Sequence, residues 1–214
     1  MKALLGILES QINPTEAIAV LAIALNVYLT ARNNIWCWAW GIVGVVLYGY
    51  VFYTTHLYSS MILQVVYYLP MQFYGWYVWL RHGPTRDNDL RIASLTIPRR
   101  FFWLGINFPL AVALGYLMHY TSAQLTYPDA LVTVMSVTAQ YLLTYKYIEN
   151  WLLWIPVDLL YTFYLLPKQG LYVSACLFFL LLLLSLWGFL QWLAVMRREA
   201  RSKLRETNKA DLQA

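Results

Sequence analysis

The stretch IENWLLWIPVDLLYTFYLL, residues 148 to 166, is almost entirely apolar but carries Asp158 near its middle. Its apolar residues follow one another without the alternation of a half-buried strand. The run is about as long as a helix must be to cross a hydrocarbon layer of roughly 30 Å. A carboxylate facing lipid at mid-depth is unfavourable by about 2.5–3.5 kcal/mol. We therefore expect a membrane-spanning helix that turns Asp158 away from lipid.

The rest of the chain has the same character. Of its 214 residues, 61% are hydrophobic and 12% charged, and the mean hydropathy is +0.53, which is outside the range of ordinary soluble domains. The predicted fold class is all-α, a polytopic membrane protein with seven transmembrane helices. The predicted spans are residues 14 to 31, 35 to 54, 59 to 80, 101 to 120, 127 to 145, 151 to 166 and 170 to 195.

The basic residues predict how the chain crosses the membrane. Seven spans place thirteen of the 15 Lys and Arg residues on the C-terminal side and leave Lys2 and Lys168 on the other. By the positive-inside rule, the C-terminus is predicted to be cytoplasmic and the N-terminus to face out. The basic loop at residues 81 to 100 and the tail from residue 197 are read as solvated anchors near the lipid bilayer, not as nucleic-acid sites.

The sequence also contains an internal repeat. A shift of 114 residues aligns LTARNNIWCWAW (29 to 40) with LTYKYIENWLLW (143 to 154), so that Arg32 lies opposite Lys146, and one residue less aligns Gly75 with Gly188. We predict a parallel 3+1+3 repeat, an arrangement typical of transporters that hold a solute near mid-membrane. The predicted parts are a first three-helix repeat (1–80), a cytoplasmic loop with a linker helix (81–126), a second three-helix repeat (127–196) and a cytoplasmic tail (197–214).

Span six carries the strongest candidate site. Trp151, Trp154, Asp158 and Tyr161 are spaced by three, four and three residues, so they follow one stripe of a helix. Two indoles and a phenol beside an acid form a plausible cage for a flat, positively charged ring, because cations bind aromatic faces. The alternative is that the tryptophans form an interfacial belt and that Asp158 caps or pairs inside the bundle.

Span three offers a second, more polar stripe that includes Gln64, Tyr68 and Gln72. Amides and phenols in apolar surroundings need hydrogen-bond partners, which sugar hydroxyls or a carboxamide would supply. Hydrogen bonds between helices are the equal alternative. Pro70 and Pro156 each remove a backbone donor inside a span, so we expect hinges or unwound turns there. Weaker polar candidates are Asn26, Asn107 and Gln140.

Three segments resemble the PnuC family of bacterial vitamin transporters. They are LQVVYYLPMQFYGWYVW (63 to 79), KYIENWLLWIPVD (146 to 158) and KQGLYVS (168 to 174), and the likeness extends from about residue 20 to 193. The resemblance implies a SWEET-like arrangement in the bacterial inner membrane and facilitated diffusion of a solute that a cytosolic kinase then traps by phosphorylation. It also implies that Gln64, Asn150, Trp151 and Trp154 bind the solute.

The resemblance implies uptake of nicotinamide riboside, with thiamine, riboflavin or a deoxynucleoside as alternatives. Where the nicotinamide riboside transporter that resembles this chain has Asn, this chain has Asp158. That departure leaves the solute open, because an acid also suits the cationic thiazolium of thiamine. The sequence leaves open whether the chain assembles with further copies of itself.

Other classes of function fit the sequence poorly. There is no GxxxxGK[ST] phosphate loop, so we do not expect the chain to hydrolyse ATP. A seven-helix receptor of the retinal type needs a lysine in its last span, and residues 170 to 195 have none. His56, His82 and His119 lie at span edges without ligand spacing, so neither an enzyme nor a metal site or cofactor is predicted.

Overall fold

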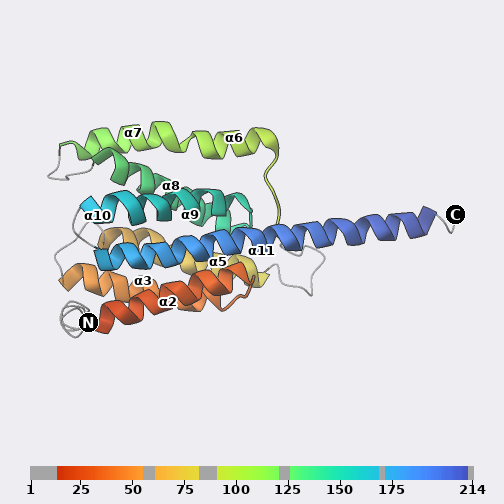
Figure 1. Ribbon diagram of the computed structural model, residues 1–214, viewed down its shortest axis with the longest axis horizontal. Coiled ribbons are helices and arrows are strands. Elements are labelled where there is room, and N and C mark those ends of the chain that lie inside the picture. Colours follow the sequence, from red (N-terminus) through yellow and green to blue (C-terminus); the bar gives the residue numbers. More distant parts are fainter. Residues whose placement is uncertain (1–13, 55–60, 82–90, 121–125, 169–171, 212–214) are drawn as a thin grey trace. The chain divides into compact units, whose positions relative to one another are not determined.

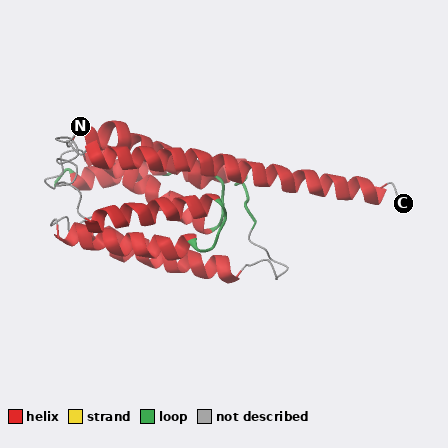
Figure 2. Cartoon of the chain, turned by 60° about the horizontal axis from the view of Figure 1, so that its bottom comes forward, coloured by secondary structure: helices red, strands yellow, loops and turns green. Residues whose placement is uncertain are grey.

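The computed structural model describes residues 14–54, 61–81, 91–120, 126–168 and 172–211. Helices joined by short turns make up nearly all of these residues (Figure 2). Over the described ranges the β-type pairing is a single bridge between Ala93 and Tyr147. The all-α prediction is confirmed. The chain divides into two compact units, Met1–Gly83 and Pro84–Ala214.

The first unit contains three helical spans. They are α2 (Pro14–Ala31), α3 (Cys37–Thr54), and a π-helical turn η1 (Leu63–Tyr68) that continues as α5 (Leu69–Arg81). The hairpin of α2 and α3 is closely packed, because a Cβ added to Gly44 would lie 2.6 Å from the Cγ1 atom of Ile23. This confirms that Gly44 permits close helix contact.

The second unit contains four helical spans, shown in Figure 1. They are α6 (Ile97–Gly105) with α7 (Asn107–Met118), α8 (Thr126–Thr144), α9 (Glu149–Leu160) with η2 (Tyr161–Leu165) and α10 (Leu166–Lys168), and α11 (Tyr172–Asp211). Within this unit α6 and α7 continue one another as a single span, the predicted linker helix.

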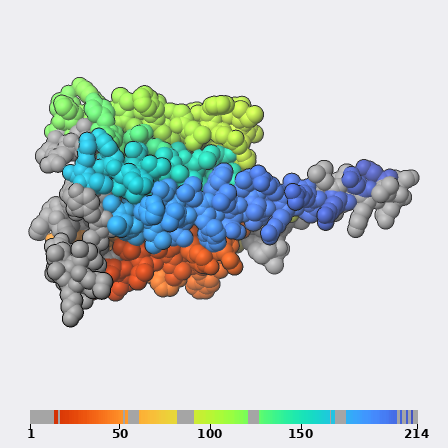
Figure 3. Space-filling model, viewed as in Figure 1, coloured from red at the N-terminus to blue at the C-terminus, as the bar shows by residue number. Residues whose placement is uncertain are grey.

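The seven predicted spans therefore all have counterparts among the described residues. Two stretches, Ile97–Met118 and Ala175–Ser202, are helical, apolar and long enough to cross a membrane, and Ala17–Ala31 and Cys37–Val51 are shorter apolar helices. The main difference lies at the C-terminus. Helix α11 is 40 residues long and continues through the charged tail, where it stands clear of the other helices of its unit (Figure 3).

Both predicted irregularities at proline coincide with π-helical turns. The turn η1 ends next to Pro70, and the Leu69 amide closes it by donating to the carbonyl of Gln64, five residues back. The turn η2 begins five residues after Pro156. A proline lacks the amide that would continue the normal pattern, and its ring crowds the carbonyl four residues earlier. A wider turn nearby relieves this conflict.

A matching turn joins the first two helices of each repeat. Asn33 and Lys146 both adopt a left-handed backbone, with φ of 52° and 54°. The Asn33 amide donates to the carbonyl of Thr30 at 2.8 Å, and the Lys146 amide donates to that of Leu143 at 2.9 Å. The two turns thus correspond at a spacing of 113 residues. Aligning Arg32 with Lys146 at a spacing of 114 was wrong by one residue.

Asn107, a weaker site candidate in the sequence, has a structural role. Its buried side chain donates to the Trp103 carbonyl at 2.6 Å and accepts a 2.9 Å hydrogen bond from the Thr138 hydroxyl. These bonds attach the linker span to α8 within the second unit. A buried amide that is satisfied in this way stabilises the packing of the two helices and needs no solute.

Candidate functional site

The helix with most of the predicted site residues is anchored at its start by Glu149. This side chain is fully buried and forms a 2.9 Å ion pair with Arg100. It also accepts hydrogen bonds from the Ser94 hydroxyl at 2.8 Å and from the Leu95 amide at 3.2 Å. Because all three donors come from the segment that leads into α6, Glu149 fixes the first turn of α9 against that segment.

Asn150 follows Glu149 and is also fully buried. Its Nδ2 donates to the carbonyl of Tyr147 at 2.7 Å. Its Oδ1, in contrast, is buried without a hydrogen-bond partner. Unpartnered buried polar atoms are unfavourable and rare, so this acceptor is a candidate for a solute donor.

Trp151 lies next along the helix and is packed on all sides. Its ring lies against Gly188 of α11, where an added Cβ would come within 2.6 Å of Cη2. It meets the ring of Trp192 edge to face, with centroids 5.6 Å apart. Only 2% of Trp151 is exposed, so the belt interpretation does not apply to it. Its Nε1 is buried without a partner and can donate to a solute.

Asp158 is buried, with 3% of its surface exposed. The Ser185 hydroxyl on α11 donates to its Oδ2 at 2.7 Å. The ion pair found among the described residues is that of Arg100 with Glu149, and Asp158 has none. The expectation that Asp158 avoids lipid is met. It is held by a neutral donor and has no counter-ion in the described part of the chain.

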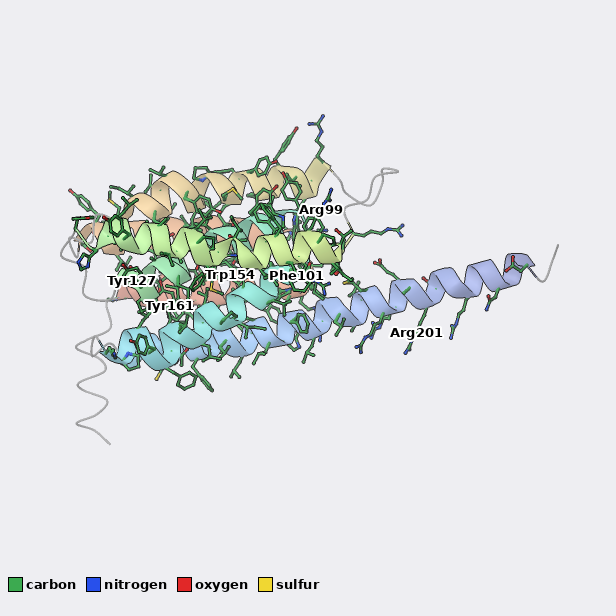
Figure 4. All side chains as sticks on the ribbon, turned by 90° about the horizontal axis from the view of Figure 1, so that it is seen from above. Arg99, Phe101, Tyr127, Trp154, Tyr161 and Arg201 are labelled. Atoms are coloured by element: carbon green, nitrogen blue, oxygen red, sulfur yellow. The ribbon has the colours of Figure 1, made fainter. Side chains whose placement is uncertain are left out.

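Trp154 and Tyr161 complete the predicted stripe and are only partly buried. Figure 4 shows them on successive turns of the same span. Trp154 packs against two apolar clusters, one containing Ala139 and the other Val132. The Tyr161 ring lies 4.5 Å from that of Phe178. The stripe is therefore divided, because Trp151, Asp158 and Tyr161 contact α11 whereas Trp154 packs with residues of α8.

The predicted residues of span three lie in the first unit. Gln64 and Tyr68 belong to η1 and are partly buried, whereas Gln72 of α5 is buried. The Oε1 of Gln72 has no hydrogen-bond partner. It lies beside Gly41, because a Cβ added there would be 2.3 Å from this oxygen and 2.9 Å from the Nδ2 of Asn26. Two amides thus gather where α3 has no side chain.

The first unit repeats the packing seen around Trp151. Trp38 lies over Gly75, where an added Cβ would come within 2.0 Å of the ring, and it meets Trp79 edge to face at 5.3 Å. Its Nε1 is also buried without a partner. These three residues precede Trp151, Gly188 and Trp192 by 113 positions each, the same spacing as the two turns.

At this spacing the units differ in their polar chemistry. Gly41 of the first unit corresponds to Trp154 of the second, and Val45 corresponds to Asp158. The aromatic and acidic residues therefore lie in one unit only. The amide of Gln72 fills the space at Gly41 in the other unit.

Sequence reasoning missed Ser185 and the network around Glu149. Ser185 is a single hydroxyl in a leucine-rich run, and nothing in the run points to Asp158. Its position relative to Gly188 could have identified it. The sequences QFYGWYVW (72 to 79) and SLWGFLQW (185 to 192) share a polar residue three before the packing glycine and a tryptophan four after it.

Comparison with known proteins places this arrangement in a family. The sequence model described as nicotinamide mononucleotide transporter matches residues 13–194. The chain belongs to this transporter family. Membership makes it a membrane transport protein, in agreement with the predicted family resemblance.

Members of the nicotinamide mononucleotide transporter family with known roles align with most of the chain. The nicotinamide riboside transporter PnuC of Escherichia coli is 26% identical over 88% of this chain and 89% of its own length. That of Neisseria mucosa is 29% identical, covering 86% and 73%. The riboflavin/roseoflavin transporter RibM of Streptomyces davaonensis is 28% identical, covering 84% of each.

A solved structure shares the fold of this family member. The crystal structure of the vitamin B3 transporter PnuC superposes with a TM-score of 0.71, at 24% identity, covering 92% of this chain and 87% of that one. The helical architecture described above is thus that of a known transporter.

Proposed function

We propose that the chain carries a flat, positively charged vitamin, nicotinamide riboside, across the bacterial inner membrane by facilitated diffusion. The observation that carries this proposal is Asp158, a buried acid with a neutral hydrogen-bond donor and no counter-ion among the described residues. Removing a carboxylate from water is strongly unfavourable unless a positive charge compensates it. The pyridinium ring of nicotinamide riboside supplies that charge.

The other residues around Asp158 have matching roles. Trp154 is only partly buried, so its indole can stack on the ring of the solute. Asn150 Oδ1 and Trp151 Nε1 are an unpartnered acceptor and an unpartnered donor. A carboxamide offers one group of each kind and would satisfy both. Tyr161, held by Phe178, closes the stripe on the side away from Trp151.

In the first unit, the predicted residues Gln64, Tyr68 and Gln72 are proposed to bind hydroxyl groups. The support is specific for Gln72, whose unpartnered Oε1 needs a donor such as a ribose hydroxyl.

We propose that the chain is a 3+1+3 repeat with α6 and α7 as the linker span. The support is the common spacing of 113 residues, which relates the two left-handed turns and the two tryptophan–glycine pairs. Thirteen of 15 basic residues on one side favour a cytoplasmic C-terminus. Phosphorylation by a cytosolic kinase would trap the solute, since the added charge prevents its return.

The test is uptake by liposomes that contain the purified protein and no energy source. We expect labelled nicotinamide riboside to enter until its inner and outer concentrations are equal. Asp158→Asn should lower uptake of nicotinamide riboside about tenfold, whereas Asp129→Asn, the same change in another acid of the unit, should have little effect. Accumulation above the outer concentration, or equal effects of both substitutions, would refute the proposal.

Riboflavin is the second candidate, because the matched relative RibM is a riboflavin/roseoflavin transporter. Riboflavin is neutral and gains nothing from an unpaired acid, whereas thiamine is cationic. The same liposomes, supplied with riboflavin or thiamine, separate these cases. Uptake of riboflavin that is insensitive to Asp158→Asn would favour the second candidate, and we expect nicotinamide riboside to be taken up fastest.

A further inference from the structure

We propose that Ser185 determines specificity by making the site prefer a positively charged solute over a neutral one of the same shape. This inference rests on the proposed function and names a residue that acts through Asp158. The Ser185 hydroxyl donates to Oδ2 of Asp158 at 2.7 Å, and both side chains are 3% exposed. The bond joins α9, which carries the predicted ring-binding residues, to α11.

The bond controls both the charge and the direction of the carboxylate. A buried carboxylate that has no donor takes a proton or turns to another partner. A hydrogen bond to an ionised group is stronger than one between neutral groups, so Ser185 stabilises the charged form and fixes one rotamer. Because Ser185 brings no positive charge, it leaves the charge of Asp158 available to a cation.

The repeat shows that this pair is an addition to the second unit. Ser185 occupies the position of Gln72, three residues before the packing glycine of its helix. The position of Asp158 is occupied in the first unit by Val45, which is buried and apolar. An acid and a donor facing it are therefore absent from the described part of the first unit at these two positions. Packing of the repeat does not require them.

The experiment compares two solutes of nearly equal shape. Calorimetry of the purified full chain would give dissociation constants for nicotinamide riboside, which is cationic, and for its dihydro form, whose ring is neutral. The variants are Ser185→Ala, which removes the donor, and Ser185→Thr, which keeps it. The matched control is Ser136→Ala on α8, because Ser136 is also buried but donates to the Val132 carbonyl of its own helix at 2.7 Å.

We expect Ser185→Ala to lower the preference for the cation about five- to tenfold, the difference between a charge-assisted and a neutral hydrogen bond. Ser185→Thr and Ser136→Ala should keep the preference. In the Asp158→Asn background, Ser185→Ala should no longer change it, because the charge has gone.

Three results would overturn the inference about Ser185 alone: an unchanged preference in Ser185→Ala, an increased one, or an equal effect in the Asp158→Asn background. Binding of neither solute by the unaltered chain would refute the proposed function, and the inference with it. Thermal unfolding of each variant identifies a loss of folding. If Ser185→Ala does not fold, the preference of Ser185→Cys, which has a weaker donor, must lie below that of Ser185→Thr.

Discussion

At the scale of single residues, the two glycines of the repeat explain how tryptophans come to be buried between helices. Gly75 and Gly188 each leave space for an indole where any side chain would collide with it. The indole is held edge to face by a second tryptophan, a geometry worth about 0.5–1.5 kcal/mol beyond burial. Rigid packing of Trp151 also fixes its Nε1, which has no partner in the described structure.

Replacing Gly188 by alanine tests this packing. The new Cβ would lie 2.6 Å from Cη2 of Trp151, so the indole must move. Overpacking of this kind costs about 1–3 kcal/mol, and we expect the unfolding temperature to fall by several degrees and binding to weaken. The control is Gly105→Ala, because an added Cβ there meets nothing within 4 Å. Equal unfolding temperatures for both variants would contradict the packing argument.

At the scale of elements, the start of α9 depends on a charge that water does not reach. Glu149 is fully buried, whereas the Arg100 side chain that pairs with it is 41% exposed. The two partners are therefore unequal. Loss of Glu149 leaves an arginine that can turn to water, but loss of Arg100 leaves a buried carboxylate with only Ser94 and Leu95 as donors.

We expect Arg100→Ala to lower the free energy of unfolding by about 2–3 kcal/mol, below the full value for a buried pair because Arg100 is partly exposed. Glu149→Gln should cost about 1 kcal/mol, since it removes the buried charge itself. Combining the two substitutions should restore most of what Arg100→Ala loses. Thermal unfolding of the three variants in detergent measures this order, and a double variant less stable than Arg100→Ala would disprove it.

The elements themselves could be predicted from the sequence, because long apolar runs form helices whatever their neighbours. The end of α11 could not, since the prediction stopped where apolar residues stop, at 195. The tail continues as helix because Arg, Lys, Glu and Ala favour it without burial. The repeat was found one residue out of register at Lys146, because matching Leu and Thr residues outweighed the turn geometry.

The candidate site was predictable only in part for a related reason. Asp158 was recognisable because a charge inside an apolar run needs an explanation. Ser185, 27 residues away on another helix, gave no such signal. Contacts between helices depend on how the chain folds back, and residue spacing within one helix carries no information about them. The division of the stripe between α8 and α11 was hidden for the same reason.

At the scale of the whole molecule, the distribution of charge sets how the chain lies in the membrane. Thirteen basic residues lie on the side of the C-terminus and only Lys2 and Lys168 on the other. Moving the cluster of arginines in the tail across the membrane would be far less favourable than leaving it in the cytoplasm, where anionic lipids also attract it. The direction of the chain thus follows from where this charge is, independently of any solute.

Trypsin distinguishes the two directions, because it cuts after lysine and arginine. With the cytoplasmic face exposed, in inverted vesicles, we expect loss of a tag fused to the C-terminus, since Arg201 and Arg205 are exposed on α11. With the outer face exposed, in spheroplasts, the tag should remain attached to a fragment that begins after Lys168, which is exposed between α10 and α11. Lys168→Gln should abolish that fragment and leave the result in vesicles unchanged. Loss of the tag in intact spheroplasts would reverse the proposed direction, and with it the side on which a kinase could trap the solute.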